Sequence, residues 1–523
     1  MEFKNIYQSR KMYLRSNILF MGLSLIMIST VLSQTSTNVE VTVTGLSNDT
    51  VYLANYYGSK LYYSDTTVSD SHGHFTFKGK EFNECGKYAV VLPGPVFFDI
   101  MLVNEPMEFQ TTKSNPQGDM VVIKSDENKV FYDYLEYLNG KREERIPHDA
   151  ILNDSTSNSL QVEIAKNAMS LMNSEVIEYQ DALIDDPRNY LFGSYLGMLR
   201  DPKVPAAPDH VEDIRLWNYL WYRSHYWDRV DFTDARLVRD GSFHQMIERW
   251  WGQVIPPDPD SLFFEAKNLL SQVEGNDDMF KYILHHMTFE SESSKVMCMD
   301  RVFVDLVNEY YVTGKVKWLE EEQLKKITDR AEALKYSICG NTAHNITLPG
   351  LDGTTWESLH DIDARYTVMV IWESSCGHCK KEMPILQRSY EEWNDKGLEI
   401  YAIGNDFEPE PWIEYLETTN YMDWTHVSDN PLINAQDSAA QLIYAGITDL
   451  QSLNFRTTFD VFSTPKLFLL DENKEILAKQ IGALQLAEML YRLDGIEPPH
   501  PEFFLSEEAI EKLRALEEKE KNK

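Results

Sequence analysis

The segment Cys376-Gly377-His378-Cys379 constrains this chain most, because it stands between an apolar run and an amphipathic stretch. The run Thr367 to Trp372 is rich in β-branched residues and predicts a buried strand, and Met383 to Trp393 has the spacing of a helix. A strand-to-helix turn places Cys376 at a helix N-terminus, where unpaired N–H groups and the helix dipole stabilise a thiolate. Cys379, one turn into the helix, can close on Cys376 and resolve a mixed disulfide.

Two other uses of such a cysteine pair are less consistent with the sequence. Half of a zinc site would need a second CxxC or an HxxxH pair, which the sequence lacks, so we expect no metal. A peroxidase would need a single peroxidatic cysteine preceded by Thr and Pro, whereas Glu373-Ser374-Ser375 stands here. His378, if cationic, would favour the thiolate of Cys376 and make the pair more oxidising. We expect the Cys376–Cys379 disulfide itself to be the redox group, with no further cofactor.

The pattern around this motif alternates strands with helices. Leu398 to Ile403 reads as a second buried strand, and helices are expected near residues 411–418 and 435–444. Two further strands, residues 466–470 and 475–480, flank an Asp-Glu-Asn-Lys turn. This order implies a mixed sheet covered by helices on both faces.

A chain of 523 residues is too long for one core, and its periodicity changes twice before the motif. Short alternating runs predict a small antiparallel β-sandwich, and a 3.6-residue period then predicts an all-α domain, with helices at residues 160–183 and 319–336. The expected divisions are a signal peptide (1–33), a β-sandwich-like domain (36–125), a helical domain (126–339), an α/β domain (340–498) and a charged tail (499–523), which we expect to be a solvated helix.

The N-terminus has the order of a signal peptide. Basic residues precede an apolar run from Ile18 to Leu32, and small and polar residues follow near Ser33. The run is shorter than the ~20 residues of a membrane-spanning helix, no cysteine follows it for lipid attachment, and no other stretch approaches that length. We therefore expect cleavage, no stable membrane span, and a location where disulfides persist. The formal charge of -34 argues against nucleic-acid binding.

Side chains outside the motif offer no defensible site. Cys85, Cys298 and Cys339 are expected to be buried small apolar residues, with a bridge between two of them left open. The aromatic stretch Leu216 to Tyr222, with Tyr226, Trp227, Trp250 and Trp251 beyond it, is expected in the core, although such rings can also line a peptide or glycan groove. His285 and His286 are adjacent and point apart on a helix, so we assign them no metal.

The region from Gly340 to Pro384, with Leu348-Pro349-Gly350-Leu351-Asp352-Gly353-Thr354 and the segment Val370 to Pro384, resembles the TlpA-type, extracytoplasmic branch of the thioredoxin superfamily. The resemblance covers residues 340–495 and implies a thioredoxin-like domain. The segment from Ser224 to Phe232 and residues 257–261 resemble a helical module of unknown function that precedes such domains in Gram-negative secreted proteins, and the β-rich segment resembles their small N-terminal domain.

This resemblance implies the site. Thr464-Pro465 would be a loop with a cis proline that faces the disulfide and pairs with a substrate peptide, and Pro384 would be the kink proline of the active-site helix. Glu382 would lie beside the disulfide, where a carboxylate could exchange the proton of Cys379; a solvated charge on the helix face is the alternative. We expect catalytic roles for Cys376, Cys379 and Glu382. The residues expected at the substrate are Trp372, Gly377, His378, Thr464 and Pro465.

Two departures from the family pattern leave the direction of electron flow open. The dipeptide between the cysteines is Gly-His, as in protein disulfide isomerases, where this branch usually has proline in second place. Val370 stands where thioredoxins proper hold a buried acid. A low reduction potential would favour a reductase, and a higher one an isomerase or oxidant.

The leading hypothesis is a periplasmic thiol-disulfide oxidoreductase of a Gram-negative envelope. It would exchange disulfides with protein thiols and receive electrons from a membrane or periplasmic donor, while the N-terminal domains select the partner. The rival hypothesis is a ligand-binding or assembly protein whose thioredoxin-like domain is a redox-responsive accessory.

Overall fold

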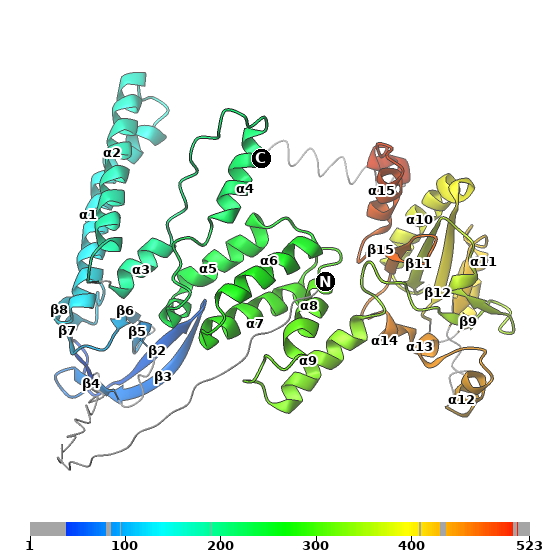
Figure 1. Ribbon diagram of the computed structural model, residues 1–523, viewed down its shortest axis with the longest axis horizontal. Coiled ribbons are helices and arrows are strands. Elements are labelled where there is room, and N and C mark those ends of the chain that lie inside the picture. The colour runs from blue at the N-terminus through cyan, green and yellow to red at the C-terminus, as the bar shows by residue number, and fades with distance from the viewer. Residues whose placement is uncertain are drawn as a thin grey trace, which may run out of the picture.

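The computed structural model describes residues 38–79, 85–94, 96–188, 190–406, 409–428, 436–505 and 510. The expected signal peptide and nearly all of the charged tail after residue 505 lie outside these ranges. Along the chain follow a β-rich body, a helical body and an α/β body, which Figure 1 shows side by side in blue, green and yellow to red. Within the described ranges, the helices include none with the length and apolar character needed to cross a bilayer.

The β-rich body is a sandwich of two four-stranded sheets, ordered β4-β1-β7-β8 and β3-β2-β5-β6. Alternate residues of β1 point inward, and Val39, Val41 and Val43 are buried in the core between the sheets. The expectation of a purely antiparallel sandwich is wrong, because β1 and β7 pair in parallel. Parallel neighbours need a crossover connection, and here the chain crosses through the opposite sheet between β1 and β7. The strands are β1 (Asn38–Thr44), β2 (Thr50–Tyr57), β3 (Lys60–Val68), β4 (His74–Lys78), β5 (Gly86–Leu92), β6 (Val96–Leu102), β7 (Met107–Thr112) and β8 (Val121–Lys124).

The helical body contains the two helices expected from periodicity, α2 (Ser159–Ile184) and α9 (Glu321–Leu334). An Asn158 capping box starts α2, which packs against α1 as a projecting hairpin (Figure 1). The other elements are α1 (Asp126–Asn153), α3 (Leu191–Met198), α4 (Ile214–Ser224), η1 (Ala235–Arg239), α5 (Gly241–Arg249), η2 (Trp250–Val254), α6 (Pro259–Gln272), α7 (Asp277–Ser293), α8 (Asp300–Leu306) and η3 (Val307–Tyr311).

The expected burial of the aromatic stretch is correct only in part. Tyr226 and Trp250 are core residues, at 3% and 1% exposure, but α4, which carries Leu216 to Tyr222, has no buried residue. Leu216 is 51% exposed, while the Tyr219 hydroxyl reaches inward to donate to the carbonyl of Val254. A helix that covers the body with one side only shows the same apolar spacing as a core helix, so periodicity alone could not separate the two.

The α/β body is the expected mixed sheet, ordered β13-β12-β11-β14-β15. The central strand β11 pairs in parallel with β12 and antiparallel with β14, and all its residues are buried. The short strand β13 and the β9–β10 hairpin were not predicted. The elements are β9 (Thr347–Pro349), β10 (Trp356–Ser358), η4 (Leu359–Asp361), β11 (Tyr366–Trp372), α10 (Cys379–Trp393), η5 (Asn394–Lys396), β12 (Leu398–Gly404), α11 (Pro409–Glu417), β13 (Thr425–Ser428), α12 (Gln436–Tyr444), α13 (Leu450–Leu453), α14 (Phe455–Thr458), β14 (Lys466–Leu470), β15 (Ile476–Lys479), α15 (Ala483–Leu493) and η6 (Pro501–Phe504).

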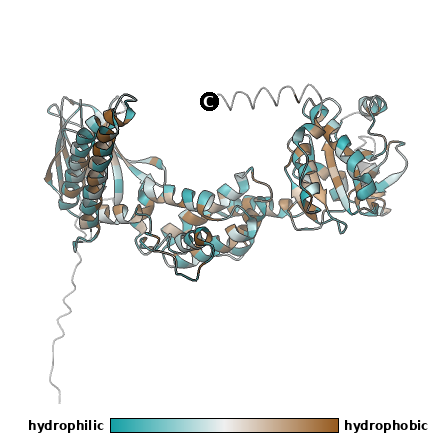
Figure 2. Ribbon diagram, turned by 90° about the horizontal axis from the view of Figure 1, so that it is seen from above, coloured by the Kyte–Doolittle hydropathy of each residue, from teal (hydrophilic) through white to brown (hydrophobic). Residues whose placement is uncertain are grey.

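Apolar residues on both faces of this sheet pack against helices. Val368 and Val370 join a core cluster with residues of α10, α11 and α15, whereas Met369 and Ile371 join one with residues of α13 and α14. Viewed from above, the apolar strands lie between helices whose outer faces are hydrophilic (Figure 2). The predicted fold class, a β-sandwich followed by an all-α domain and an α/β domain, is therefore confirmed, while the exact domain boundaries stay predictions.

The helical and α/β bodies are joined by covalent and ionic contacts. A disulfide links Cys298, just before α8, to Cys339, which follows α9. Both cysteines are buried, as expected, and the bridge is one of those that the sequence left open. Cys85 remains a free, half-buried thiol, and burial raises its pKa. Lys479 of β15 forms a buried ion pair with Asp300 of α8.

Candidate active site

The dithiol occupies the turn between β11 and α10, at the carboxyl edge of the sheet. The next parallel strand, β12, ends at the same edge and places Asn405 and Asp406 beside this turn. The Asp406 carboxylate accepts hydrogen bonds from the backbone N–H and hydroxyl of Ser374, and Asn405 donates to Glu373 at 2.7 Å. The loop after β12 therefore holds the segment that leads into the dithiol. These residues were not predicted from the sequence, although the shared edge of parallel strands could have indicated them.

Cys376 is the more accessible thiol, and its sulfur lies close to backbone donors at the start of α10. Its Sγ accepts a hydrogen bond from the backbone N–H of Cys379 at 3.4 Å, and its thiol faces the carbonyl of Thr464 at 3.3 Å. Partial burial raises the pKa of Cys376, but hydrogen bonds around the sulfur, that of the Cys379 N–H foremost, outweigh it and hold the pKa below the usual thiol value. Cys376 is thus set up as the nucleophile.

Cys379 has the opposite character. Its side chain is fully buried under Cys376 within the cluster of α10, α11 and α15, and burial raises its pKa to about 12. At neutral pH this thiol therefore keeps its proton. The arrangement separates the two sulfurs into an ionisable outer one and a protonated inner one.

A proline loop faces the dithiol from the start of β14. The Thr464–Pro465 peptide bond is cis, as the resemblance implied, and the Thr464 carbonyl is the group that contacts the Cys376 sulfur. Phe462, in the same loop, is 84% exposed. The loop thus offers backbone next to the sulfur and an exposed ring beside it.

Glu382 lies one turn after Cys379 on α10 and is half-buried. Its Oε2 accepts a hydrogen bond from the backbone N–H of Ala483 at 2.6 Å, at the N-terminus of α15. A carboxylate at that position satisfies an otherwise unpaired helix donor and complements the helix dipole. The structure therefore gives Glu382 a helix-capping contact, and its expected role in proton exchange stays a prediction.

The residues expected to contact a substrate are not all at the surface. Gly377 and His378 are exposed beside Cys376, whereas Trp372 is 1% exposed and its ring lies near Tyr415 within the core. Trp372 ends a strand that is buried on both faces, so its ring does not lie at the surface beside Cys376. Its expected contact with a substrate stays a prediction.

A cleft of about 610 Å³ opens next to the dithiol. His378 and Glu382 line one side, and the proline loop with Lys466 lines the other. Within the described ranges, His, Cys, Asp and Glu side chains form no group of three that could hold a metal ion. The side chains that line the cleft include the imidazole of His378, the carboxylates of Glu382 and Asp460, and the amine of Lys466.

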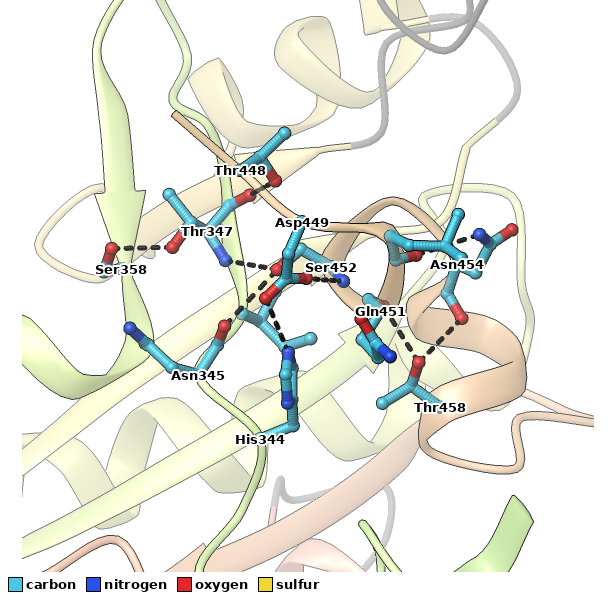
Figure 3. Close-up of polar contacts among 12 residues, drawn as sticks. His344, Asn345, Thr347, Ser358, Thr448, Asp449, Gln451, Ser452, Asn454 and Thr458 are labelled. Atoms are coloured by element: carbon cyan, nitrogen blue, oxygen red, sulfur yellow. Dashed lines mark hydrogen bonds and ion pairs between the residues drawn. The ribbon is translucent and has the colours of Figure 1, made fainter. Parts of the chain in front are cut away.

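A polar network anchors the segment that leads into the proline loop (Figure 3). Asp449 accepts from the backbone N–H of Ser452 at the start of α13, and its other oxygen pairs with His344 at 2.8 Å. The Ser452 hydroxyl in turn accepts from the N–H of Thr347 in β9. The short helices before the loop are thus fixed to the first strand of the α/β body.

The mixed sheet, the dithiol at a helix start and the facing cis proline together define a thioredoxin-like domain of the thiol-disulfide oxidoreductase class. A model of the AhpC/TSA family matches residues 339–479. Two models described as domains of unknown function (DUF4369 and DUF5106) match residues 37–131 and 158–337.

Individual relatives each resemble part of the chain. The thiol-disulfide oxidoreductase ResA of Halalkalibacterium halodurans is 34% identical over 14% of this chain, which spans 39% of that relative's length. ResA of Bacillus cereus is 26% identical over 30% of this chain and 79% of its own. A solved domain of a possible thiol-disulfide isomerase from Cytophaga hutchinsonii is 30% identical, with 30% of this chain and 94% of that chain covered and a TM-score of 0.25.

Proposed function

We propose that this protein exchanges disulfides with protein substrates through Cys376 and Cys379, in an extracytoplasmic compartment. The observation that carries the proposal is the contrast between the two thiols: an accessible sulfur with a lowered pKa lies over a buried one whose pKa is raised to about 12. A nucleophilic thiol paired with a protected resolving thiol is what exchange requires.

In the reducing direction, the thiolate of Cys376 attacks one sulfur of a substrate disulfide. The substrate S–S bond breaks, its second sulfur leaves as a thiolate, and a mixed disulfide with Cys376 forms. Cys379 then loses its proton and attacks the Cys376 sulfur, which releases the substrate dithiol and leaves the Cys376–Cys379 disulfide. A reduced thiol donor from the membrane or the periplasm returns two electrons, and the oxidising direction is the reverse sequence.

Two further groups have roles in this proposal. The carbonyl of Thr464, beside the cis proline, is 3.3 Å from the Cys376 sulfur, so a substrate strand pairing with this backbone would bring its disulfide to the nucleophile. Glu382 lines the same cleft one turn beyond Cys379 and would take the proton of that thiol.

The Cys298–Cys339 disulfide supports the proposed compartment. Structural disulfides persist in secreted and periplasmic proteins and are rare in the reducing cytosol. A periplasmic location also agrees with the signal peptide expected from the sequence.

Reduction of insulin disulfides by dithiothreitol, followed by turbidity, tests the activity. Wild-type protein should accelerate the reaction, Cys376→Ser should abolish the acceleration, and Cys379→Ser should accumulate a mixed disulfide visible by mass spectrometry. Cys85→Ser, which removes the third free thiol, is the matched control and should behave as wild type. Equal activity of wild-type protein and Cys376→Ser would refute the proposal.

A further inference from the structure

The loop that faces the dithiol is bound by a side chain from the helical body. Arg330 of α9 pairs with both carboxylate oxygens of Asp460, with Nη2 at 3.2 Å from Oδ2. Asp460 stands just before the loop that ends in the cis proline, and α9 packs against α14, the helix that leads into it. The helical body thus contacts the chain within a few residues of the cis-proline loop that faces the dithiol.

The contact has the geometry of a specific interaction. A two-pronged arginine–carboxylate pair fixes direction as well as distance, unlike a point charge. The Asp460 side chain is 13% exposed and that of Arg330 is 30% exposed, so the pair is partly withdrawn from water. Glu292 of α7 pairs with Nε of the same guanidinium at 3.2 Å and orients it from behind.

Arg330 also approaches the loop itself. Its guanidinium lies over the ring of Phe462 at 5.8 Å from the centroid, a cation–π distance. This ring is 84% exposed and is two residues from Thr464, the residue whose carbonyl contacts Cys376. Arg330 therefore contacts the loop at two places, Asp460 where the loop begins and the exposed ring of Phe462.

Lys466 closes the loop at its other end. Its amine donates to the backbone carbonyl of Asp460, so the residue after the cis proline returns to the residue where the loop begins. The Lys466 side chain is 11% exposed, and burial lowers its pKa to about 8. The loop is thus a short closed unit, and Asp460 is the point at which the helical body holds it.

We propose that Arg330 is a positioning residue for thiol-disulfide exchange, through which the helical domain holds the cis-proline loop against Cys376. The inference rests on the proposed function and assigns the helical domain a part in it. A substrate strand must pair with the loop backbone while its disulfide reaches Cys376, so a displaced loop weakens binding of a protein. A small alkylating agent needs no such pairing and reacts with Cys376 as before.

The test compares Arg330→Met, Arg330→Lys and Asp460→Asn with Arg223→Met. Arg223 pairs with Glu265 at 2.7 Å within the helical body, and both side chains are about one-fifth exposed, which makes it a matched control. We expect Arg330→Met to raise hydrogen exchange of the amides of residues 461–464 about tenfold and to lower kcat/KM for insulin about tenfold, mainly through KM. Iodoacetamide should alkylate Cys376 within about twofold of the wild-type rate.

Arg330→Lys should restore part of the protection of these loop amides from hydrogen exchange. Asp460→Asn should lower that protection as Arg330→Met does, because it weakens the same pair from the aspartate side. If Arg330→Met fails to fold, Asp460→Asn tests the same ion pair in its place. Unchanged loop protection in both variants, or an equal loss in Arg223→Met, would overturn the assignment of Arg330. If wild-type protein fails to reduce insulin, the proposed function is overturned, whereas hydrogen exchange still decides the role of Arg330.

Discussion

Lys479 of β15 and Asp300 of α8 form a buried ion pair that crosses from the α/β body to the helical body. The lysine side chain is 1% exposed and the aspartate side chain 10%, and the amine also lies 3.4 Å from the hydroxyl of Ser337. Burial of such a pair is costly, but removal of one partner leaves the other charge without compensation. The two bodies therefore share a contact that is sensitive to either side chain.

Lys479→Met should lower the free energy of unfolding by about 3–5 kcal/mol, because Asp300 would remain buried without its partner. Urea denaturation followed by tryptophan fluorescence measures the loss, and the double variant Lys479→Met/Asp300→Leu should recover most of it. Lys396→Met, which breaks an exposed pair with Glu392, is the control and should cost under about 1 kcal/mol. A loss equal to that control would contradict the prediction.

The pH dependence of alkylation should reveal the lowered pKa of Cys376. Because only the thiolate reacts, the rate rises with pH through this pKa, and its midpoint should fall below the ~8.5 of free cysteine. The measurement uses iodoacetamide on the reduced Cys85→Ser protein. Cys379, with a pKa raised to about 12, should stay unmodified through this range. A midpoint at or above that of free cysteine would refute the expected nucleophile.

Glu382→Gln should slow the second step of exchange rather than the first. Glutamine keeps an acceptor for the Ala483 N–H and so preserves the start of α15, but it cannot take the proton of Cys379. We expect the mixed disulfide to persist at least about tenfold longer at pH 7 and the difference to shrink at higher pH. Quenched-flow mass spectrometry follows the species, with Glu392→Gln on the same helix as control. A uniform slowing of both steps would point to a structural role alone.

Acid should weaken the network around Asp449 shown in Figure 3. Burial raises the pKa of Asp449, but hydrogen bonds from Ser452 and His344 outweigh it, so the folded value lies below the unfolded one. The carboxylate therefore stabilises the fold above about pH 4, and this contribution is lost as the pH falls through the folded value. The urea concentration at the midpoint of unfolding should fall less steeply between pH 5 and pH 2 in Asp449→Asn than in wild-type protein. Asp329→Asn is the control and should follow the wild-type curve.

Replacement of both Cys298 and Cys339 by serine should lower the free energy of unfolding by about 4 kcal/mol. The reason is that the disulfide closes a loop with a sequence separation of 41 residues and so reduces the entropy of the unfolded chain. The active dithiol is separate from this bond, so insulin reduction at 25 °C should remain near the wild-type rate. Urea unfolding and the turbidity assay on the same preparation check both statements. Loss of exchange in a protein that is still folded would show that the bond serves the site as well.

Local sequence was enough to predict the strand–dithiol–helix unit, because β11 is a nearly continuous run of apolar and β-branched residues and Cys376 and Cys379 follow its end. The strands at residues 398–403 and 466–470 carry the same signal. The four-residue strand β13 and the parallel pairing of β1 with β7 were missed, since short elements and strand order depend on contacts between distant segments.

The supporting residues of the site depend on such contacts even more. Asp406, Arg330 and Lys466 are ordinary charged residues in the sequence, and only the fold brings them to the turn and the loop around the dithiol. The bond between Cys298 and Cys339 was left open for the same reason, because spacing alone does not choose among three cysteines. The burial of Trp372 likewise depends on the helices that pack over the end of β11.

The Cys298–Cys339 bond also limits how the two bodies can move apart. It turns residues 298–339 into a covalent ring that contains α9, and the chain leaves this ring directly into the α/β body. If the ion pairs between the two bodies break, the disulfide still holds Cys339, where the chain leaves the helical body, next to the start of α8. Motion between the bodies would then be a rotation about a fixed pivot, and the separated surfaces would meet again at high effective concentration.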